Sequence, residues 1–329
     1  MSGTAFLLAD GLPLLQERKG FVLAPFPGSS PVIWLDAISI NSYPSGDLLD
    51  NSITPVMPDL PGDGFVPEVS GEEYMNQVDS IKKLILEGTA GKVVLSRQLP
   101  VELDKEFNAV RFFNVLSDLY PEAFVYLASF PGYAVWTGAT PETLLRIRGT
   151  KLTTMALAGT RKSGETGEWG EKDVAEHNFV ADFIDMQLKS AGCQNILKSE
   201  AHSLNAGMVM HLRTDFSADC RRDQISDIVQ ALHPTPAVCG WPPEKALEII
   251  KRTETYERGY YAGYLGPAGE DTTDLFVNLR CMQLFKGKAI VYAGGGLTAG
   301  SDPQKEWDET VLKSTTMLSA IEKMRNLAV

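Results

Sequence analysis

Four short apolar runs follow one another between residues 124 and 155, and no helical segment separates them. The runs cover residues 124–127, 133–136, 144–147 and 152–155, with Pro or Gly residues between them. Apolar runs bounded by such turn residues predict strands that pair with their neighbours in sequence. A parallel sheet would need a helix or a long crossover after each strand. The chain is therefore expected to build mostly antiparallel sheets rather than a doubly wound parallel sheet.

Helical periodicity is found on both sides of this block. Residues 72–87 carry apolar side chains at helical spacing, and Gly88 follows as a stop signal. The same reasoning predicts helices at 110–119, 173–188, 225–232, 244–251 and 303–324 (the last capped by Asp302), and strands at 21–23, 32–35, 92–101, 275–285 and 289–293. Strands in blocks with helices packed outside them predict an α+β fold class.

Bulk properties exclude several classes of function. The formal net charge of −12 argues against a nucleic-acid-binding protein, which would present a basic face. No run approaches the roughly 20 apolar residues of a membrane-spanning helix, and no signal-peptide pattern opens the chain. The four cysteines are scattered, which argues against a disulfide framework or a zinc site. We expect a cytoplasmic protein without nucleic-acid or membrane partners.

Two pairs of carboxylates occur at helical spacing. Asp173 and Glu176 are three residues apart in one expected helix, and Glu306 and Glu309 repeat this spacing in the last helix. Mg²⁺ prefers oxygen ligands, so two such helices can jointly hold the ion. The alternative is two solvated helix faces, which is the common fate of such pairs.

Three further charged residues have apolar neighbours. Lys92 opens one expected strand, Glu142 heads another, and Arg280 lies within the expected strand 275–285. A buried lysine tends to lose its charge and can act as a base, whereas a buried glutamate keeps its proton and can act as an acid. A half-buried arginine needs an anionic partner, either a salt bridge or a bound carboxylate. Solvent-facing positions for Lys92 and Glu142 are the alternative.

A glycine-rich segment, Gly294–Gly296, lies between the expected strand 289–293 and the last helix. Exposed amides in such a loop can bind a carboxylate or a phosphate. Gly294, Gly296 and Ala299 also fit a degenerate dinucleotide-binding fingerprint. That fingerprint needs a following strand with an acidic ribose ligand, and only one helix remains before the chain ends. We therefore reject a nucleotide-binding module.

Nine segments in residues 70–320 resemble, in order, the motifs of the chorismate-utilising enzymes. They are GKVVLSR at Gly91, ATPETLL at Ala139, ALAGTRK at Ala156, EKDVAEHN at Glu171, MHLRT at Met210, LHPTPAVCG at Leu232, YYAGYLG at Tyr260, NLRC at Asn278 and YAGGGLTAGSDPQKEWDET at Tyr292. The resemblance implies one α+β domain, residues 1–329, with large antiparallel sheets flanked by helices. Residues 70–325 would form its catalytic core and residues 1–65 a short N-terminal strand region, with a break at residues 61–64.

Single positions separate the reactions of this family. By the resemblance, Lys92 marks members that activate water, whereas anthranilate synthase component I carries Gln there. Ala158 stands where aminodeoxychorismate synthase has a nucleophilic lysine, and Ala237 stands where salicylate and anthranilate synthases carry Thr. The resemblance therefore implies an isochorismate synthase. Such an isomerase adds water at ring carbon 2 of chorismate and removes the hydroxyl at carbon 4.

The resemblance also implies a role for each site residue. Lys92 would be the base that activates water, and Glu142 would be the acid that protonates the leaving hydroxyl. Mg²⁺ would be held by four carboxylates, the first two directly and the others through water: Glu176, Glu309, Asp173 and Glu306. Arg280 and Tyr261 would hold the enolpyruvyl carboxylate. The full set of substrate-binding positions would be Ala158, Gly159, Thr160, His211, Ala237, Tyr261, Arg280, Gly294, Gly295 and Gly296.

Two alternatives to this interpretation remain. A lyase of the same family would form salicylate or anthranilate, and a non-catalytic protein would bind chorismate without converting it. The presence of both Lys92 and Glu142 favours catalysis. We expect a monomer that needs no glutamine amidotransferase partner. Because only about 70 residues precede the first matching motif, we also expect no feedback inhibition by tryptophan. The product would feed menaquinone or siderophore biosynthesis.

Overall fold

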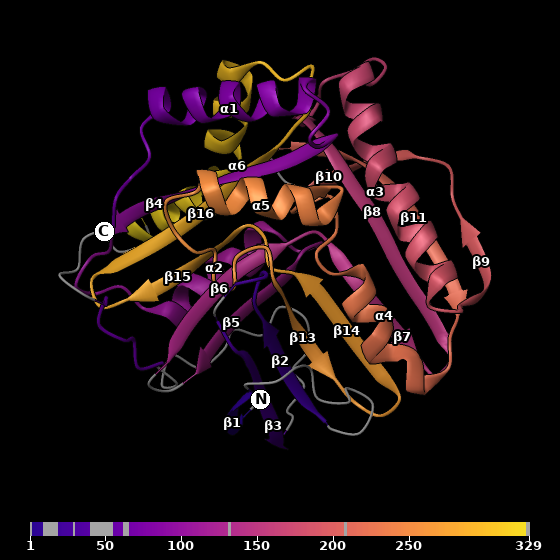
Figure 1. Ribbon diagram of the computed structural model, residues 1–329. Coiled ribbons are helices and arrows are strands. Elements are labelled where there is room, and N and C mark those ends of the chain that lie inside the picture. The colour runs from indigo at the N-terminus through magenta and orange to yellow at the C-terminus, as the bar shows by residue number, and fades with distance from the viewer. Residues whose placement is uncertain are drawn as a thin grey trace.

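The computed structural model describes residues 2–8, 19–28, 30–39, 55–61, 66–130, 133–206 and 209–326. Two sheets form its centre, and helices lie around them (Figure 1). Every strand pairing among the described residues is antiparallel. The expected α+β class with antiparallel sheets is therefore confirmed. Residues 62–64 of the expected break lie outside the described residues.

The larger sheet has ten strands within the described residues. They are β1 (Ser2–Leu8), β2 (Gly20–Ala24), β3 (Val32–Ser39), β7 (Thr143–Arg148), β8 (Lys151–Lys162), β9 (Gln194–Lys198), β10 (His202–Ala206), β11 (Val209–Asp219), β13 (Tyr264–Ala268) and β14 (Thr272–Val277). Their order is β1-β3-β2-β13-β14-β7-β8-β11-β10, and β9 also pairs with β11. The N-terminal strands thus join this sheet through the pairing of β2 with β13.

The smaller sheet has six strands in the part of the chain that the structure describes. They are β4 (Lys92–Glu102), β5 (Phe124–Phe130), β6 (Ala134–Thr140), β12 (Gly240–Trp241), β15 (Cys281–Phe285) and β16 (Lys288–Leu297). Their order is β12-β4-β16-β15-β6-β5. Alternate residues of β15 face two different cores, because side chains alternate along a strand. Cys281 and Phe285 point into the core between the sheets, whereas Met282 and Leu284 belong to a second core on the other face.

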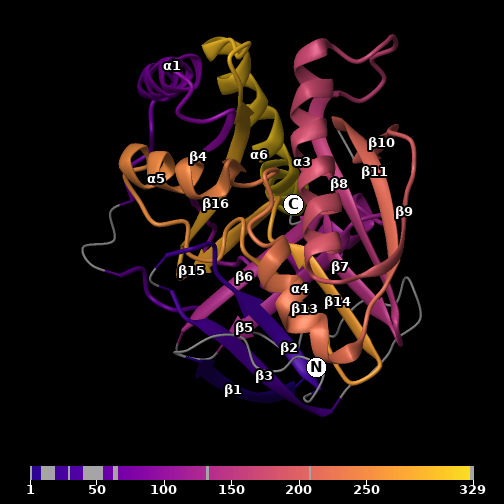
Figure 2. The same ribbon diagram turned by 45° about the vertical axis from the view of Figure 1, so that its right-hand side comes forward.

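Helices pack against both sheets. They are α1 (Gly71–Leu86), α2 (Ala109–Leu119), α3 (Glu171–Ser190), α4 (Ile225–Leu232), α5 (Pro243–Thr253) and α6 (Pro303–Asn326), with a 3₁₀ turn at Arg222–Gln224. Helix α3 lies along β8 and β11, while α2 and α6 close the second core over the smaller sheet (Figure 2). Asp302 caps α6 as expected, because its Oδ1 accepts a hydrogen bond from the Lys305 amide at 3.0 Å.

Two chain segments pass side by side from one sheet to the other. One joins β6 to β7 through Pro141, and the other joins β14 to β15 through residues 278–280. The Ala139 amide donates to the Arg280 carbonyl, and the Val277 amide donates to the Glu142 carbonyl, each at 3.0 Å. Glu142 and Arg280 therefore lie at the bend between the sheets.

The single strand expected at residues 275–285 is wrong. The chain forms β14 and β15 in different sheets and turns at Arg280, whose φ of +47° lies outside the extended region. The turn depends on hydrogen bonds to the β6–β7 segment, which is distant in sequence, so the local apolar pattern does not reveal it.

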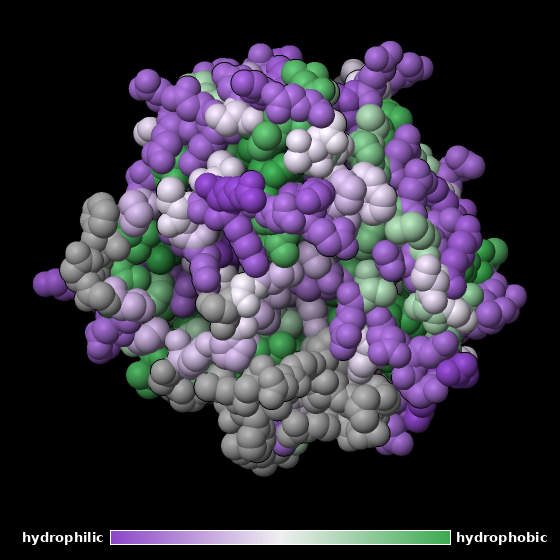
Figure 3. Space-filling view, viewed as in Figure 1, coloured by the Kyte–Doolittle hydropathy of each residue, from purple (hydrophilic) through white to green (hydrophobic). Residues whose placement is uncertain are grey.

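The face of the molecule in Figure 3 is mostly hydrophilic, with small apolar areas between polar ones. None of the helices that the structure describes is long and apolar enough to cross a membrane.

Candidate active site

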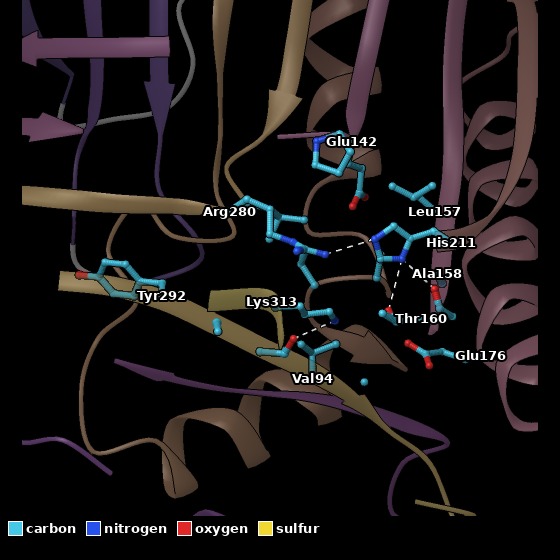
Figure 4. A pocket seen from close by; sticks show the side chains of 18 of the residues that line it. Val94, Glu142, Leu157, Ala158, Thr160, Glu176, His211, Arg280, Tyr292 and Lys313 are labelled. Atoms are coloured by element: carbon cyan, nitrogen blue, oxygen red, sulfur yellow. Dashed lines mark hydrogen bonds between the residues drawn. The ribbon is translucent and has the colours of Figure 1, made fainter. Parts of the chain in front are cut away.

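A pocket lies where the two sheets meet (Figure 4). Strands β8 and β11 of the larger sheet and strands β4 and β16 of the smaller sheet contribute to its walls, and the bend residues Glu142 and Arg280 close one side. Most of the residues expected from the sequence line it: Glu142, Ala158, Gly159, Thr160, Glu176, His211, Ala237, Tyr261, Arg280, Gly294 and Gly296. Five other expected residues, Lys92, Gly295, Asp173, Glu306 and Glu309, are not among the lining residues.

Lys92 is fully buried at the start of β4, directly behind the pocket wall. Its Nζ lies 3.0 Å from Glu176 Oε1, an ion pair that lacks hydrogen-bond geometry. A Cβ at Gly296 would lie 2.2 Å from that oxygen and 2.9 Å from Lys92 Cε. Gly296 therefore has to be glycine, because the Lys92–Glu176 pair fills the space where a side chain would go. Glu176 and Gly296, which line the pocket, separate Lys92 from it.

Glu142 is a buried acid, and only 3% of the residue is exposed. Burial raises the pKa of Glu142 to about 8, although the positive charges of Lys92 and Lys313 act in the opposite direction. The carboxyl therefore keeps its proton at neutral pH. Figure 4 shows the side chains of Glu142 and Glu176 at different sides of the pocket.

A bulge in β8 places His211 at the pocket wall. Gly159 and Thr160 together oppose His211 of β11, because the register shifts between Met210 and Leu212. Gly159 has a φ of +74°, which a side chain would disfavour. His211 Nδ1 lies 2.8 Å from the Gly159 carbonyl and 3.3 Å from Thr160 Oγ1. The bulge thus directs the imidazole into the site.

His211 in turn orients Arg280. Arg280 Nη2 lies 3.3 Å from His211 Nε2, and Arg280 Nη1 donates to Thr316 Oγ1 at 3.2 Å. Burial, and then the nearby Arg280 charge, lower the pKa of His211 to about 3, so the ring is neutral. These partners assign the proton to Nδ1, which donates to the Gly159 carbonyl, and leave Nε2 to accept from Arg280.

Arg280 has no carboxylate within ion-pair distance among the residues that the structure describes. Of the two options that the sequence leaves for this half-buried arginine, a structural salt bridge is therefore not formed. A guanidinium held by neutral partners in a pocket is suited to bind an anionic group of a ligand.

The glycines expected in a loop lie instead in strand β16. Gly294, Gly295 and Gly296 pair with Ser96, Leu95 and Val94 of β4. A Cβ at Gly294 would lie 2.9 Å from the Tyr261 hydroxyl, so Gly294 faces the pocket. Gly295 faces the other side of the strand, toward Glu306 and Glu309. The expected loop at Gly294–Gly296 is therefore wrong. Strand β16 continues through these glycines because its pairing with β4 is unbroken there.

The expected metal ligands come from the N-terminal parts of α3 and α6. Glu306 is almost fully buried and lies 2.6 Å from Lys172, and Glu309 lies 2.6 Å from Lys313. Burial and the neighbouring Glu309 raise the pKa of Glu306 to about 7. Burial alone would raise the pKa of Glu309 too, but the positive charges of Lys313 and Lys172 outweigh it and lower that pKa. The carboxylates therefore repel one another, and lysines compensate them.

A hard dication fits these residues by the chemistry of its ligands. The donors are all carboxylate oxygens, and Glu306 Oε2 is buried without a hydrogen-bond partner. Within the described ranges, no three carboxylate, imidazole or thiolate side chains already converge on one point. The lysine contacts explain this, since each of Glu176, Glu306 and Glu309 is held by an ammonium group.

Lys313 is the main pocket residue that sequence reasoning misses. It lines the pocket and donates to the Gly294 carbonyl at 3.0 Å (Figure 4). Its position four residues after Glu309 on the last helix is the signal that could have identified it, because such residues share a helix face. The remaining lining residues missed from sequence are Val94, Pro141, Leu157, Val238, Leu279, Tyr292 and Ala293.

The fold thus places a pocket that contains a buried arginine between two antiparallel sheets. The family model described as "Chorismate binding enzyme" matches residues 63–322, and the chain belongs to this family. The family resemblance is therefore confirmed.

The relatives of this chain include proteins named for two different activities. The salicylate biosynthesis isochorismate synthase of Pseudomonas aeruginosa is 31% identical over 98% of this chain and 70% of its own length. Anthranilate synthase component 1 of Acetivibrio thermocellus is 32% identical over 78% of this chain and 54% of its own length. The chain thus spans about half the length of some curated relatives. The menaquinone-specific isochorismate synthase of Escherichia coli shares the fold, with a TM-score of 0.76, 23% identity, and coverage of 94% of this chain and 80% of that one.

Proposed function

We propose that this protein is an isochorismate synthase, an isomerase that converts chorismate to isochorismate reversibly. The observation that carries the proposal is the placement of a buried lysine and a protonated glutamate around one pocket. Lys92 is held at its wall by Glu176, and Glu142 lines it from the bend between the sheets. Ala158 and Ala237 also line this pocket, at the positions that separate the family's reactions.

In the proposed reaction, Lys92 takes a proton from a water molecule that attacks ring carbon 2. To act as a base, the Lys92 amine must leave its ion pair with Glu176. Glu142 gives its proton to the hydroxyl that leaves carbon 4, and the ring double bonds shift. One water enters and one leaves, so the product is an isomer of the substrate. No ammonia is needed, and we propose that no glutamine amidotransferase partner takes part.

The remaining pocket residues hold and orient the substrate in this proposal. Arg280, positioned by His211 and Thr316, binds the enolpyruvyl carboxylate together with Tyr261. Tyr261 is fixed for this task by stacking on Tyr292, with ring centroids 5.2 Å apart. Mg²⁺, held by Glu176 and Glu309 with Asp173 and Glu306 behind them, would supply positive charge for the ring carboxylate.

Product analysis tests the proposal against its alternative, a lyase of the same family. Purified protein is incubated with chorismate and Mg²⁺. The products are separated by chromatography, and their masses are measured by mass spectrometry. An isochorismate synthase yields a non-aromatic product with the mass of chorismate and releases no pyruvate. Fluorescent salicylate or anthranilate together with pyruvate would establish the lyase instead, and unchanged chorismate would indicate a binding protein.

Removal of the divalent metal is expected to abolish turnover. Glu309→Ala should have the same effect and should not respond to added Mg²⁺, because the ring carboxylate then lacks its counter-charge. The measurement is the initial rate before and after chelation and after Mg²⁺ is restored. Glu322→Ala, an exposed carboxylate on the same helix, is the matched control and should keep the wild-type response. Full activity in excess chelator would contradict the metal assignment.

Arg280→Met is expected to raise KM for chorismate by about 10- to 100-fold, the usual cost of removing a hydrogen bond to a charged group. The reason is the lost contact with the enolpyruvyl carboxylate, which is made before and during the reaction. Steady-state kinetics give the two constants separately. Arg146→Met removes an exposed arginine that pairs with Asp274 and should change neither constant. An unchanged KM in Arg280→Met would place the carboxylate elsewhere.

A further inference from the structure

Three glutamates at the site are each paired with one lysine, and one of these pairs differs from the other two. Lys92 is fully buried in β4, and Lys313 is fixed by a second bond to the Gly294 carbonyl. Lys172 bridges instead from the first turn of α3 to Glu306 on α6. Its side chain is 29% exposed, compared with 0% for Lys92 and 17% for Lys313. Lys172 is therefore the most exposed of the three lysines.

Lys172 is the one cation within ion-pair distance of the Glu306 carboxylate among the described residues. Glu306 Oε1 lies 2.6 Å from Lys172 Nζ, while the other oxygen is buried without a hydrogen-bond partner in the described part of the chain. A buried carboxylate without a counter-charge is strongly unfavourable. A proton or a cation must therefore neutralise Glu306 in the folded protein, and in this structure the Lys172 ammonium group lies against it.

Charge balance indicates what can replace Lys172. In their charged forms, four carboxylates (Asp173, Glu176, Glu306 and Glu309) face three ammonium groups (Lys92, Lys172 and Lys313), which leaves one net negative charge. If Lys172 leaves and a dication enters, the cluster becomes neutral. If both stay, a net positive charge is confined in a largely buried site, and Lys172 competes for the same carboxylate oxygen.

We propose that Lys172 is a displaceable counter-cation that occupies Glu306 in the metal-free protein and moves to solvent when Mg²⁺ binds. Lys172 is a positioning residue in this role. It keeps the first turns of α3 and α6 together before the ion arrives, at the cost of competing with it. The inference rests on the metal site of the proposed function, but its test uses binding and needs no turnover.

Titration calorimetry with Mg²⁺ alone tests the competition. Lys172→Met should bind Mg²⁺ about tenfold more tightly than the wild type. Without metal, this variant should melt at a lower temperature than the wild type, and excess Mg²⁺ should remove this difference in melting temperature. Lys172→Arg keeps the charge and should restore wild-type values. Lys189→Met removes a lysine from the same helix that pairs with Asp185 in solvent, and it should change neither quantity.

A second measurement follows the Lys172 amine directly. Brief acetylation with acetic anhydride, read by mass spectrometry of peptides, should label Lys172 faster when Mg²⁺ is present, with Lys189 as the internal reference. Weaker or unchanged Mg²⁺ binding by Lys172→Met, or slower labelling with Mg²⁺, would overturn the proposal, because Lys172 would then support the ion. Absence of any Mg²⁺ binding by the wild type would overturn it too. A chain that binds Mg²⁺ as expected here but forms no isochorismate would overturn the proposed function alone.

Discussion

Lys92→Ala is expected to lower kcat for isochorismate formation by about 10²- to 10⁴-fold, the usual contribution of a general base. The reason is that Lys92 is the proposed base for the attacking water. KM should change much less, because Lys92 lies behind the pocket wall and does not line the pocket. Steady-state kinetics at saturating chorismate and Mg²⁺ provide the measurement.

Lys92→Ala also leaves Glu176 without its ion-pair partner, so a second variant is needed to separate chemistry from folding. Lys92→Gln fills more of the same space and carries the residue typical of anthranilate synthase component I. It should melt close to the wild type and remain inactive in isochorismate formation. Lys151→Ala removes an exposed lysine at the start of β8 and should be fully active. Wild-type turnover in either Lys92 variant would disprove the base assignment.

Glu142→Gln is expected to lower kcat by a similar factor of about 10²–10⁴, because the amide keeps the shape of the side chain but has no acidic proton to give. The pH profile of the wild type carries the same information. Burial raises the pKa of Glu142 to about 8, so the acid form dominates below that value. Turnover should therefore fall as the pH rises through about 8. A rate that stays constant to well above this pH would contradict the role of Glu142.

The raised pKa of Glu142 also affects stability, with a sign that can be worked out. The folded protein binds this proton more tightly than the unfolded chain, whose glutamates titrate near 4.5. The resulting stabilisation is complete below that pH and is lost as the pH rises toward about 8. Glu142→Gln has no such proton and should show a flatter dependence of unfolding free energy on pH over this range.

The periodic helices are the elements that the sequence predicts most closely. Residues 72–87 and 303–324 are expected to be helical, and α1 and α6 cover Gly71–Leu86 and Pro303–Asn326. An apolar stripe that repeats every turn is a local signal, so no knowledge of the partner element is needed.

Strands that depend on distant partners are less visible in the sequence. β9 and β10 are short, largely exposed and polar, and β11 has charged residues within its alternating pattern. These segments become strands because β8 provides an edge for β11, which then pairs with the other two. The turn at Arg280 between β14 and β15 has the same origin, since the β6–β7 segment holds it.

The residues of the site follow from the motifs, but their contacts do not. The sequence singles out Lys92, Glu176 and Glu309 as separate functional residues. The structure shows Lys92 and Glu176 as one ion pair, and Glu309 paired with Lys313. The Lys92–Glu176 contact joins β4 to α3. The Glu309–Lys313 pair lies on α6, and it reaches the site only because α6 packs on β16. Tertiary packing decides which charged residues of different elements pair. Such pairs have no fixed spacing in the sequence, so the sequence does not predict them.

The origin of the new hydroxyl oxygen tests the central claim most directly. The reaction is run in water enriched in ¹⁸O, and the isochorismate formed early in the reaction is analysed by mass spectrometry. Attack by a water that Lys92 activates predicts that the carbon 2 hydroxyl carries the heavy oxygen, and that Lys92→Gln forms almost none of this product. Isochorismate that keeps the unlabelled oxygen of chorismate would contradict the account, because the hydroxyl would then have moved without an activated water.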